Sequence, residues 1–259
     1  MCLILLAWRA NPDYPLVVAA NRDEFFARPS APAAFWNESP QILAGRDLEA
    51  GGSWLGVSRQ GRFAALTNYR EGDQQRPDAP SRGALVADFL AGSEDPLSCL
   101  SRIAAHGADY KGFNLFVGNG RQLGYYSNRG DAPRWLTPGI YGLSNHLLDT
   151  PWPKLASAKA EFTRALDELP DESAFFSLLA DREIVPDRHL PETGVPLAWE
   201  RILSAVFVGS ADYGTRASTV LTVRKDGQVR LVERSFGVDA ALLGEVCQVF
   251  QSSLISTGV

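Results

Sequence analysis

The stretch CLILLAWRANPDYPLVVAANRDE, residues 2–24, decides the fold. Within it, the apolar runs 3–8 and 16–20 flank a turn rich in Asn, Asp and Pro. Apolar runs of this length around such a turn predict a buried β-hairpin. Because the two arms are similar in length, we expect Cys2 at the end of one arm to lie beside the polar cluster 21–24 at the end of the other. A thiol and several ionisable side chains would then share one place.

Cys2 has an ordinary interpretation and a chemical one. Free cysteines are commonly buried and act as small hydrophobes. At position 2, however, a small side chain favours removal of the initiator methionine, which would leave a thiol and an α-amine on the same residue. That amine has a reference pKa of about 7.7–8.0 and can accept the thiol proton near neutral pH. We therefore expect Met1 to be absent from a catalytic form of the protein.

Composition and charge exclude several function classes. The chain has 259 residues, 45% of them hydrophobic, and a net charge of −5, which argues against a nucleic-acid-binding surface. Its three cysteines are widely separated, and its three histidines have no ligand spacing, so we expect no disulfide framework, no metal and no cofactor. No apolar run has the length of a membrane span. We expect a single domain over 1–259 in the cytoplasm.

The pattern beyond residue 24 is strands, then helices, then strands. Hairpins are predicted over 54–68 and 215–236, with further strands over 113–128 and 134–145. Helices are predicted after Ser81, after Asp95, after Thr150 and after Asp171, whereas 28–32 and 181–200 are expected to be irregular. Cys99 is expected on a helix and Cys247 in an apolar C-terminal segment, so both thiols should react slowly. Such segregation of strands and helices indicates an α+β layered domain.

The NRDE motif carries a resemblance to a known family. Ala20-Asn21-Arg22-Asp23-Glu24, which follows an N-terminal Met-Cys strand, resembles the signature of the NRDE family, also called the transport and Golgi organisation family. That family resembles N-terminal nucleophile hydrolases of the cholylglycine hydrolase and penicillin V acylase type. The resemblance implies a four-layer αββα sandwich with two mainly antiparallel sheets. It also implies cleavage of non-peptide amide bonds by an N-terminal cysteine.

Catalytic roles follow from matching the acylase motifs one at a time. The resemblance makes Cys2 the nucleophile and Asp23 the residue that hydrogen-bonds its amine or thiol. Asn68 and Asn145 resemble the amide donors of the acylases, and such donors stabilise a developing oxyanion. Arg216 resembles an arginine before a serine-containing strand, and near Cys2 it would favour the thiolate. Each residue also has a structural interpretation, as a turn residue or as a charge at a strand edge.

Further residues are expected to line the same site: Asn21, Arg22, Tyr69 and His146. The acylases carry an arginine where this chain has Ala20, and here the arginine stands two positions later, at Arg22. Because side chains alternate along a strand, Arg22 should point to the face opposite Asn21 and Asp23.

More than one function fits these residues. The first is an amidohydrolase or acyltransferase acting on a small acylated substrate. The second is a non-catalytic carrier or trafficking factor for a small molecule, with haem as one ligand suggested by the family resemblance. A third, glutamine amidotransferase, is disfavoured because the chain has Cys2-Leu3-Ile4 where those enzymes have Cys-Gly-Ile. The substrate and the oligomeric state stay open at this point.

Overall fold

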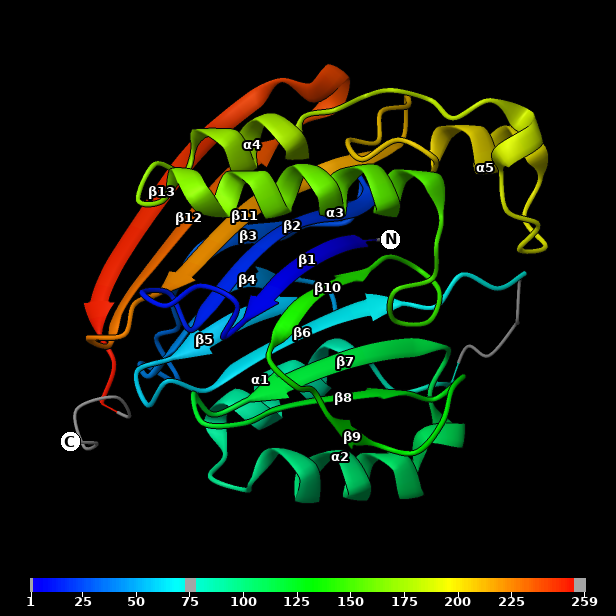
Figure 1. Cartoon of the computed structure of the whole chain (residues 1–259). Helices are drawn as coiled ribbons and strands as arrows, with labels where there is room; N and C mark the ends of the chain where they lie inside the picture. The colour runs from blue at the N-terminus through cyan, green and yellow to red at the C-terminus, as the bar shows by residue number, and fades with distance from the viewer. Residues whose placement is uncertain (1, 73–77, 254–259) are drawn as a thin grey trace.

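Two antiparallel β-sheets lie face to face, and helices cover the outer face of each (Figure 1). The computed structural model describes residues 2–72 and 78–253. Sheet A has the strand order β10-β1-β2-β11-β12-β13, and sheet B has the order β3-β4-β5-β6-β7-β8-β9. The α+β sandwich of four layers predicted from the sequence is therefore confirmed. In the part of the chain that the structure describes, no helix is both long and apolar enough to cross a membrane.

Sheet A is built on the hairpin that opens the chain. Its strands are β1 (Cys2–Trp8), β2 (Leu16–Phe25), β10 (Gly139–Leu143), β11 (Tyr213–Val223), β12 (Gln228–Phe236) and β13 (Leu242–Gln251). The pairing of β1 with β2 places Cys2 directly opposite Arg22 and Leu3 opposite Asn21. Directly opposed residues of an antiparallel pair project to the same face of the sheet. The hairpin register therefore decides which residues can meet the Cys2 thiol.

The side chains on the two faces of β1 pack into two different hydrophobic cores. Ile4, Leu6 and Trp8 join the core between the two sheets, whereas Leu3 and Leu5 join the core under the helices. This alternation gives an uninterrupted apolar run, as expected of a strand that is buried on both faces. It also places the side chain of Cys2 between the sheets.

Two helices cover the outer face of sheet A. They are α3 (Pro153–Ala165) and α4 (Ser173–Leu179), which lie side by side above β1, β2 and β11 (Figure 1). Phe162 and Phe175 meet edge to face at 5.4 Å between ring centroids and are fully buried beneath the helices. A short helix, α5 (Leu197–Ile202), lies beyond the N-terminal end of α3 (Figure 1) and packs against Tyr213 through Trp199.

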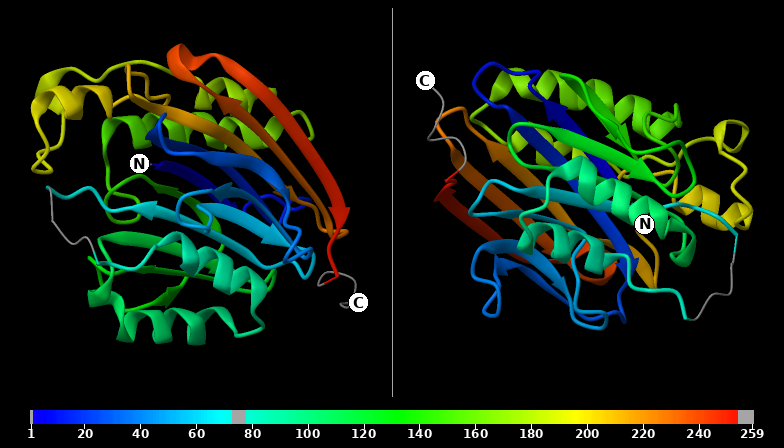
Figure 2. Two further views of the ribbon diagram at one scale, coloured as in Figure 1. Left: turned by 180° about the vertical axis from the view of Figure 1, so that it is seen from behind. Right: turned by 90° about the horizontal axis from the view of Figure 1, so that it is seen from below.

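Sheet B has the matching arrangement on the other side of the sandwich. Its strands are β3 (Ser30–Phe35), β4 (Ile42–Asp47), β5 (Leu55–Ser58), β6 (Phe63–Asn68), β7 (Phe113–Gly118), β8 (Leu123–Ser127) and β9 (Arg134–Trp135). Helices α1 (Gly83–Ala91) and α2 (Pro96–Ala105) pack on its outer face through Phe89, Leu90 and Leu100. Seen from behind and from below, the two helical layers remain on opposite outer faces (Figure 2).

Several sequence predictions need correction. Residues 30–32 belong to β3 although a loop was expected, and β13 was not predicted at all. Helix α5 lies at the end of a segment that was expected to be irregular. The side chain of Asp95 caps α2 as expected, accepting from the N–H groups of Leu97 and Ser98. Helix α1 differs, because its N-cap is Arg82 rather than Ser81, without a capping side-chain hydrogen bond.

Candidate functional site

A cavity of about 410 Å³ opens where the β1–β2 hairpin ends, between the two sheets. Its walls come from the ends of β1, β2, β4 and β6, from the turn after β4 and from the start of α1. The polar side chains that line it are Cys2, Arg22, Asp23, Glu24, Arg28, Asp47, Glu49, Ser53, Asn68, Ser81, Arg82 and Lys111. A volume of this size suits a small molecule. We call this space the Cys2 cavity.

Cys2 lies in the wall of this cavity with 9% of its surface exposed. Burial raises the pKa of its thiol, and the nearby Asp23 carboxylate acts in the same direction. The Arg22 guanidinium and the backbone N–H of Asp23 oppose that shift by favouring the thiolate. The net direction of the shift in the thiol pKa is upward in this chain, which carries Met1. A lowered thiol pKa was expected for a chain without Met1, and it stays a prediction. Met1, whose removal was expected, lies outside the described residues.

Arg22 is the guanidinium that faces Cys2. It is 5% exposed, and its Cζ lies 4.3 Å from the ring centroid of Trp54 across the space between the sheets. Its Nη2 lies 3.5 Å from Asp47 Oδ2 and 3.9 Å from Glu24 Oε2. As predicted, Arg22 points to the face opposite Asn21, which contacts the helical layer instead. Because Arg22 lies opposite Cys2, its positive charge takes the role expected of Arg216, which is to favour the thiolate.

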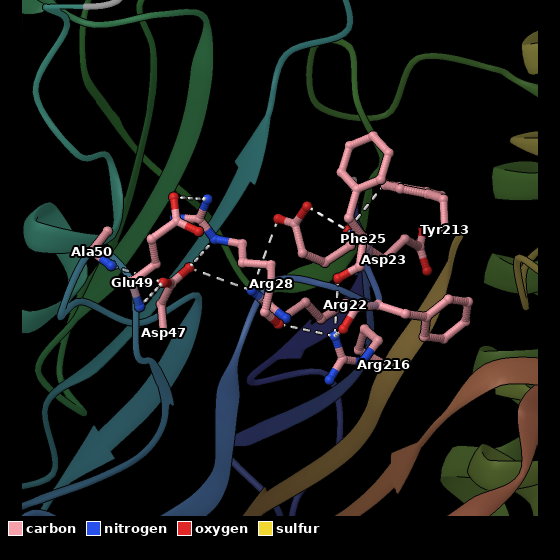
Figure 3. Close-up of polar contacts among 11 residues, drawn as sticks. Arg22, Asp23, Phe25, Arg28, Asp47, Glu49, Ala50, Tyr213 and Arg216 are labelled. Carbon is pink, nitrogen blue, oxygen red and sulfur yellow. Dashed lines mark hydrogen bonds and ion pairs between the residues drawn. The ribbon is translucent and has the colours of Figure 1, made fainter. Parts of the chain in front are cut away.

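Arg216 itself does not reach the Cys2 cavity, so that expectation is wrong. The pairing of β11 with β2 shifts register between Thr215 and Ala217, which leaves Arg216 as the extra residue of a β-bulge. Its Nη1 donates to the carbonyls of Phe25, Phe26 and Arg28 at 3.0, 3.2 and 3.1 Å. Figure 3 shows these contacts beside Arg22. Arg216 therefore orders the chain that leaves β2.

Asp23 is buried next to Cys2 and is held on two sides. Its Oδ1 accepts a hydrogen bond of 2.7 Å from the Thr215 hydroxyl, and its backbone carbonyl accepts one of 3.0 Å from the Tyr213 hydroxyl. Burial raises the pKa of the Asp23 carboxyl, whereas Lys154, the Thr215 hydroxyl and Arg70 act to lower it. The carboxyl group thus has a fixed orientation and nearby positive charges.

Those charges belong to a buried polar group beneath the site. Lys154 is 6% exposed, and its Nζ donates to the carbonyl of Leu203 at 2.6 Å. Arg70 and Glu200 form an ion pair of 2.6 Å between side chains that are 2% and 3% exposed. Buried charges of this kind need compensation by partners. Together with Asp23, which lines the cavity, they form a buried set of two basic and two acidic side chains that interact with one another.

The two asparagines predicted as oxyanion donors have different positions. Asn68 ends β6 and lines the Cys2 cavity. Asn145 is fully buried, and its Nδ2 donates to the backbone carbonyl of Asn68 at 2.9 Å. The backbone N–H of Arg70 in turn donates to the carbonyl of Asn145 at 2.6 Å. Asn145 therefore positions the strand end that carries Asn68, and only Asn68 faces the cavity.

The remaining predicted residues hold the surrounding structure. Asn21 donates through Nδ2 to the carbonyls of Leu179 and Val206 at 2.8 and 2.9 Å, which ties β2 to the helical layer. Tyr69 and His146 stack with 4.9 Å between ring centroids, and burial lowers the pKa of His146. Asn21, Tyr69 and His146 are not among the described residues that line the Cys2 cavity. The expectation that they line the site is therefore wrong.

Several cavity residues were missed by the sequence reasoning. Arg82 lies at the start of α1, where its Nη1 donates to the carbonyl of Gly112 at 2.9 Å and its charge interacts with the Cys2 thiol. Asp47 accepts from Arg28 Nε at 2.7 Å. Although burial opposes it, the contact with Arg28 holds the pKa of Asp47 below its usual value. Trp54 comes shortly after Gly51-Gly52, and this glycine pair was the one feature of the sequence that indicated a turn in this region.

Over residues 2–72 and 78–253, the structure contains no group of three or more His, Cys, Asp or Glu side chains arranged to hold a metal ion. The charged groups at the Cys2 cavity instead form ion pairs between arginines and carboxylates. What the arrangement offers chemically is a thiol, a buried carboxyl group, a guanidinium and an amide around one cavity.

Two solved structures that are similar to this chain are an amidase ortholog and a hydrolase mutant by their titles. One is a Caenorhabditis elegans N-acylethanolamine-hydrolyzing acid amidase ortholog, with 15% identity, 85% of this chain and 92% of that chain covered, and a TM-score of 0.42. Another is the C2A mutant of a conjugated bile acid hydrolase from Clostridium perfringens, with 7% identity, coverage of 97% and 92%, and a TM-score of 0.49. At these identities and TM-scores, we infer neither a substrate nor a mechanism for this chain from the two structures.

Sequence relatives give a much stronger match. The Transport and Golgi organization protein 2 homolog of Bos taurus is 43% identical over 91% of this chain and 93% of its own length. The Homo sapiens homolog is 40% identical with the same coverage, and the Drosophila melanogaster protein is 29% identical over 92% of this chain and 94% of its own length. The family model for Transport and Golgi organisation 2 matches residues 1–237. The chain therefore belongs to the Transport and Golgi organisation 2 family.

Proposed function

We propose that this protein is a cysteine amidohydrolase or acyltransferase that acts on a non-peptide amide of a small acylated substrate. The observation that carries the proposal is the position of Cys2. Its side chain lies in the wall of a cavity of about 410 Å³, with Arg22 directly opposite on β2 and Asn68 on the neighbouring sheet. A nucleophile, a charge that favours its ionised form and an amide donor around one cavity are the requirements of acyl transfer.

The chemical steps follow from the roles that these groups can take. The Cys2 thiolate attacks the carbonyl carbon of the substrate amide, and the oxygen becomes an oxyanion. The Asn68 side-chain amide donates to that oxyanion, a contact worth about 2.7–4 kcal/mol in measured oxyanion holes. The C–N bond then breaks, the amine leaves with a proton, and a Cys2 thioester remains. Water or an acceptor amine attacks the thioester and regenerates the thiol.

The proton of the Cys2 thiol needs an acceptor. After removal of Met1, the α-amine of Cys2 would be adjacent to its own thiol, with a reference pKa of about 7.7–8.0. The buried Asp23 carboxyl would orient that amine and balance its charge, while Arg22 favours the thiolate. This supports Asp23 as a positioning residue and the α-amine as the base. A free thiol as nucleophile also suits a reducing compartment, and we propose the cytoplasm.

Turnover of a panel of N-acyl anilides by purified protein lacking Met1 tests this proposal. Cys2→Ala should abolish anilide cleavage, whereas Cys247→Ala, which changes an exposed cysteine, should leave it intact. Asn68→Ala should lower kcat about 100-fold or more with little change in KM, because the donor contacts only the developing oxyanion. Cleavage that survives Cys2→Ala would exclude the proposed mechanism.

A carrier function is the second candidate, and one observation favours it. Burial raises the pKa of the Cys2 thiol in the chain as described, which is the opposite of what a nucleophile needs. The relatives are also named for transport and Golgi organisation rather than for an activity. A carrier would keep its affinity for a small ligand after Cys2→Ala and would cleave none of the anilides. Equilibrium binding to the Cys2→Ala variant, measured beside the turnover assay, separates the two functions.

A further inference from the structure

A second cavity, of about 310 Å³, adjoins the Cys2 cavity on the other side of Arg22. It lies where β12 and β13 of sheet A pass over β3 of sheet B. Arg22 and Trp54 line both cavities, so these two side chains form the partition between them. The bulge of β11 places Arg216 and Ala217 beside Arg22, which pairs with Ala217. We call this space the Arg216 cavity.

The two arginines of this cavity have unused donors. Arg22 Nη1 and Arg216 Nε are buried, and neither has a hydrogen-bond partner among the residues that the structure describes. The two guanidinium groups are also close enough for the charge of Arg22 to lower the pKa of Arg216, after the larger effect of burial. Buried donors without partners are costly, especially when they are charged. An oxyanion that accepts from both arginines would remove that cost.

The carboxylates of the cavity already have partners. Glu233 is 2% exposed, and its two oxygens accept from the backbone N–H of Ala33 at 2.7 Å and from the Thr219 hydroxyl at 3.0 Å. Glu245 is paired with Arg234 at 2.8 Å. These contacts leave the free donors of Arg22 and Arg216 as the unmatched groups of the cavity. The missing partner is therefore an acceptor supplied by a ligand.

The rest of the lining is largely apolar. Pro32, Phe236, Leu243 and Val246 contribute to the wall, and Leu243 is 67% exposed at the surface. A cavity with a few convergent polar groups and apolar walls is typical of a small-molecule site. The apolar wall would suit a hydrocarbon body that is attached to the anionic group.

We propose that the Arg216 cavity binds a carboxylate or phosphate group carried on an apolar body, with Arg22 and Arg216 as its donors. Guanidinium groups match the geometry of carboxylate and phosphate oxygens. The site does not require Cys2 to be a nucleophile. If the protein is an enzyme, this cavity would hold an anionic part of the substrate next to the Cys2 thiol. If the protein is a carrier, the cavity would hold the carried ligand itself.

Binding of octanoate and of octyl phosphate to the intact protein, measured by calorimetry, tests the proposal, with octanamide as the neutral comparison. At least one anion should bind, and octanamide should bind at least about tenfold more weakly than that anion. The anion that binds more tightly identifies the head group that the cavity prefers. Absence of binding by both anions, or equal binding of octanamide, would overturn the proposal.

A pair of substitutions at Ser235 locates the binding. Ser235 lines the Arg216 cavity but not the Cys2 cavity, and it is not hydrogen-bonded to either arginine in the described part of the structure. Ser235→Asp should weaken the anion about tenfold or more by like-charge repulsion, whereas Ser235→Asn should change its affinity less than about threefold. Arg216→Gln should weaken it as well, and gives a second measurement if Ser235→Asp does not fold.

The converse control lies in the other cavity. Lys111 lines only the Cys2 cavity, so Lys111→Gln should leave anion binding unchanged. Loss of affinity in Lys111→Gln, with full affinity in Ser235→Asp and Arg216→Gln, would place the anion in the Cys2 cavity and overturn the proposal. Because Cys2→Ala should retain the anion, failure of the amidohydrolase proposal would be visible separately in the turnover assay.

Discussion

Substitution of Lys154 tests the buried charges beneath the site through the pH dependence of stability. The Lys154 ammonium lies in α3 with 6% exposure and donates to the backbone carbonyls of Leu203 and Ala205 at 2.6 and 3.4 Å. Burial lowers its pKa from the ordinary value of 10.5 to about 8, with Arg70 acting in the same direction and Asp23 against it. We use Lys154→Met, which keeps the length of the side chain and removes its charge.

The sign of the effect follows from the lowered pKa. Between pH 8 and 10.5 the unfolded chain holds the Lys154 proton and the folded chain has released it. The free energy of unfolding therefore rises with pH in this interval, by up to about 3 kcal/mol for this group. Between pH 7.5 and pH 10 we expect about 2 kcal/mol of that rise. In Lys154→Met this contribution should be absent.

Urea denaturation at pH 7.5 and pH 10 measures the difference between wild type and variant. Other groups titrate in this range, since burial raises the pKa of Cys2 and of Tyr213, but they are present in every protein compared. Lys159→Met is the matched control, because Lys159 lies in the same helix and pairs with Asp149 nearer the surface. It should show the wild-type pH dependence. The reasoning fails if Lys154→Met gains as much stability from pH 7.5 to pH 10 as wild type does.

Two further predictions concern stability and use the same denaturation assay. Arg70→Met should lower the free energy of unfolding by about 3–5 kcal/mol, because it leaves the buried Glu200 without its cationic partner at 2.6 Å. Its control, Arg201→Met, breaks an exposed ion pair with Asp187 and should cost less than about 1 kcal/mol; equal costs would contradict the role of burial. Asn21→Ala should lower the free energy of unfolding by about 2–3 kcal/mol, because it leaves the buried carbonyls of Leu179 and Val206 without their donor. Ligand binding in the Cys2 cavity should not change, because Asn21 does not line that cavity. Loss of ligand binding in the Cys2 cavity, with unchanged stability, would show that Asn21 acts in the site after all.

The opening hairpin could be predicted because local signals determine it. The apolar runs, the turn and the similar arm lengths place Cys2 at the end of β1 beside the cluster on β2, and the register confirms that arrangement. The alternation of side chains also placed Arg22 on the face opposite Asn21. Directly opposed residues of an antiparallel pair project to the same face of the sheet, so Cys2 and its partner Arg22 lie on one face. For this reason Arg22, and not Arg216, is the guanidinium beside the thiol.

The errors come from features that the local sequence does not reveal. The bulge at Arg216 adds one residue to β11 and turns the side chain toward the carbonyls after β2, and no residue pattern indicates it. The direction of the Asn145 amide depends on the backbone of Asn68, which is distant in sequence. Strand β3 contains Pro32, a residue that is typical of loops and of sheet edges.

The strand at the other sheet edge was missed for a related reason. Strand β13 lies at the edge of sheet A, so only some of its side chains are buried and the alternation is weak. Cys247 on this strand was expected to be unreactive within an apolar segment, but it is exposed. Cys99 differs, because burial raises its thiol pKa to about 11. Any comparison of thiol reactivity must therefore remove Cys247 first.

The most direct test of Cys2 as the nucleophile is mass spectrometry of the Cys247→Ser protein after reaction with an acylating β-lactone. Untagged protein is digested, and the peptide that begins the chain is compared with the peptide that contains Cys99. The account predicts that Met1 is absent and that the acyl group is on Cys2, while Cys99 remains unmodified. Complete retention of Met1 together with an unmodified Cys2 would contradict it.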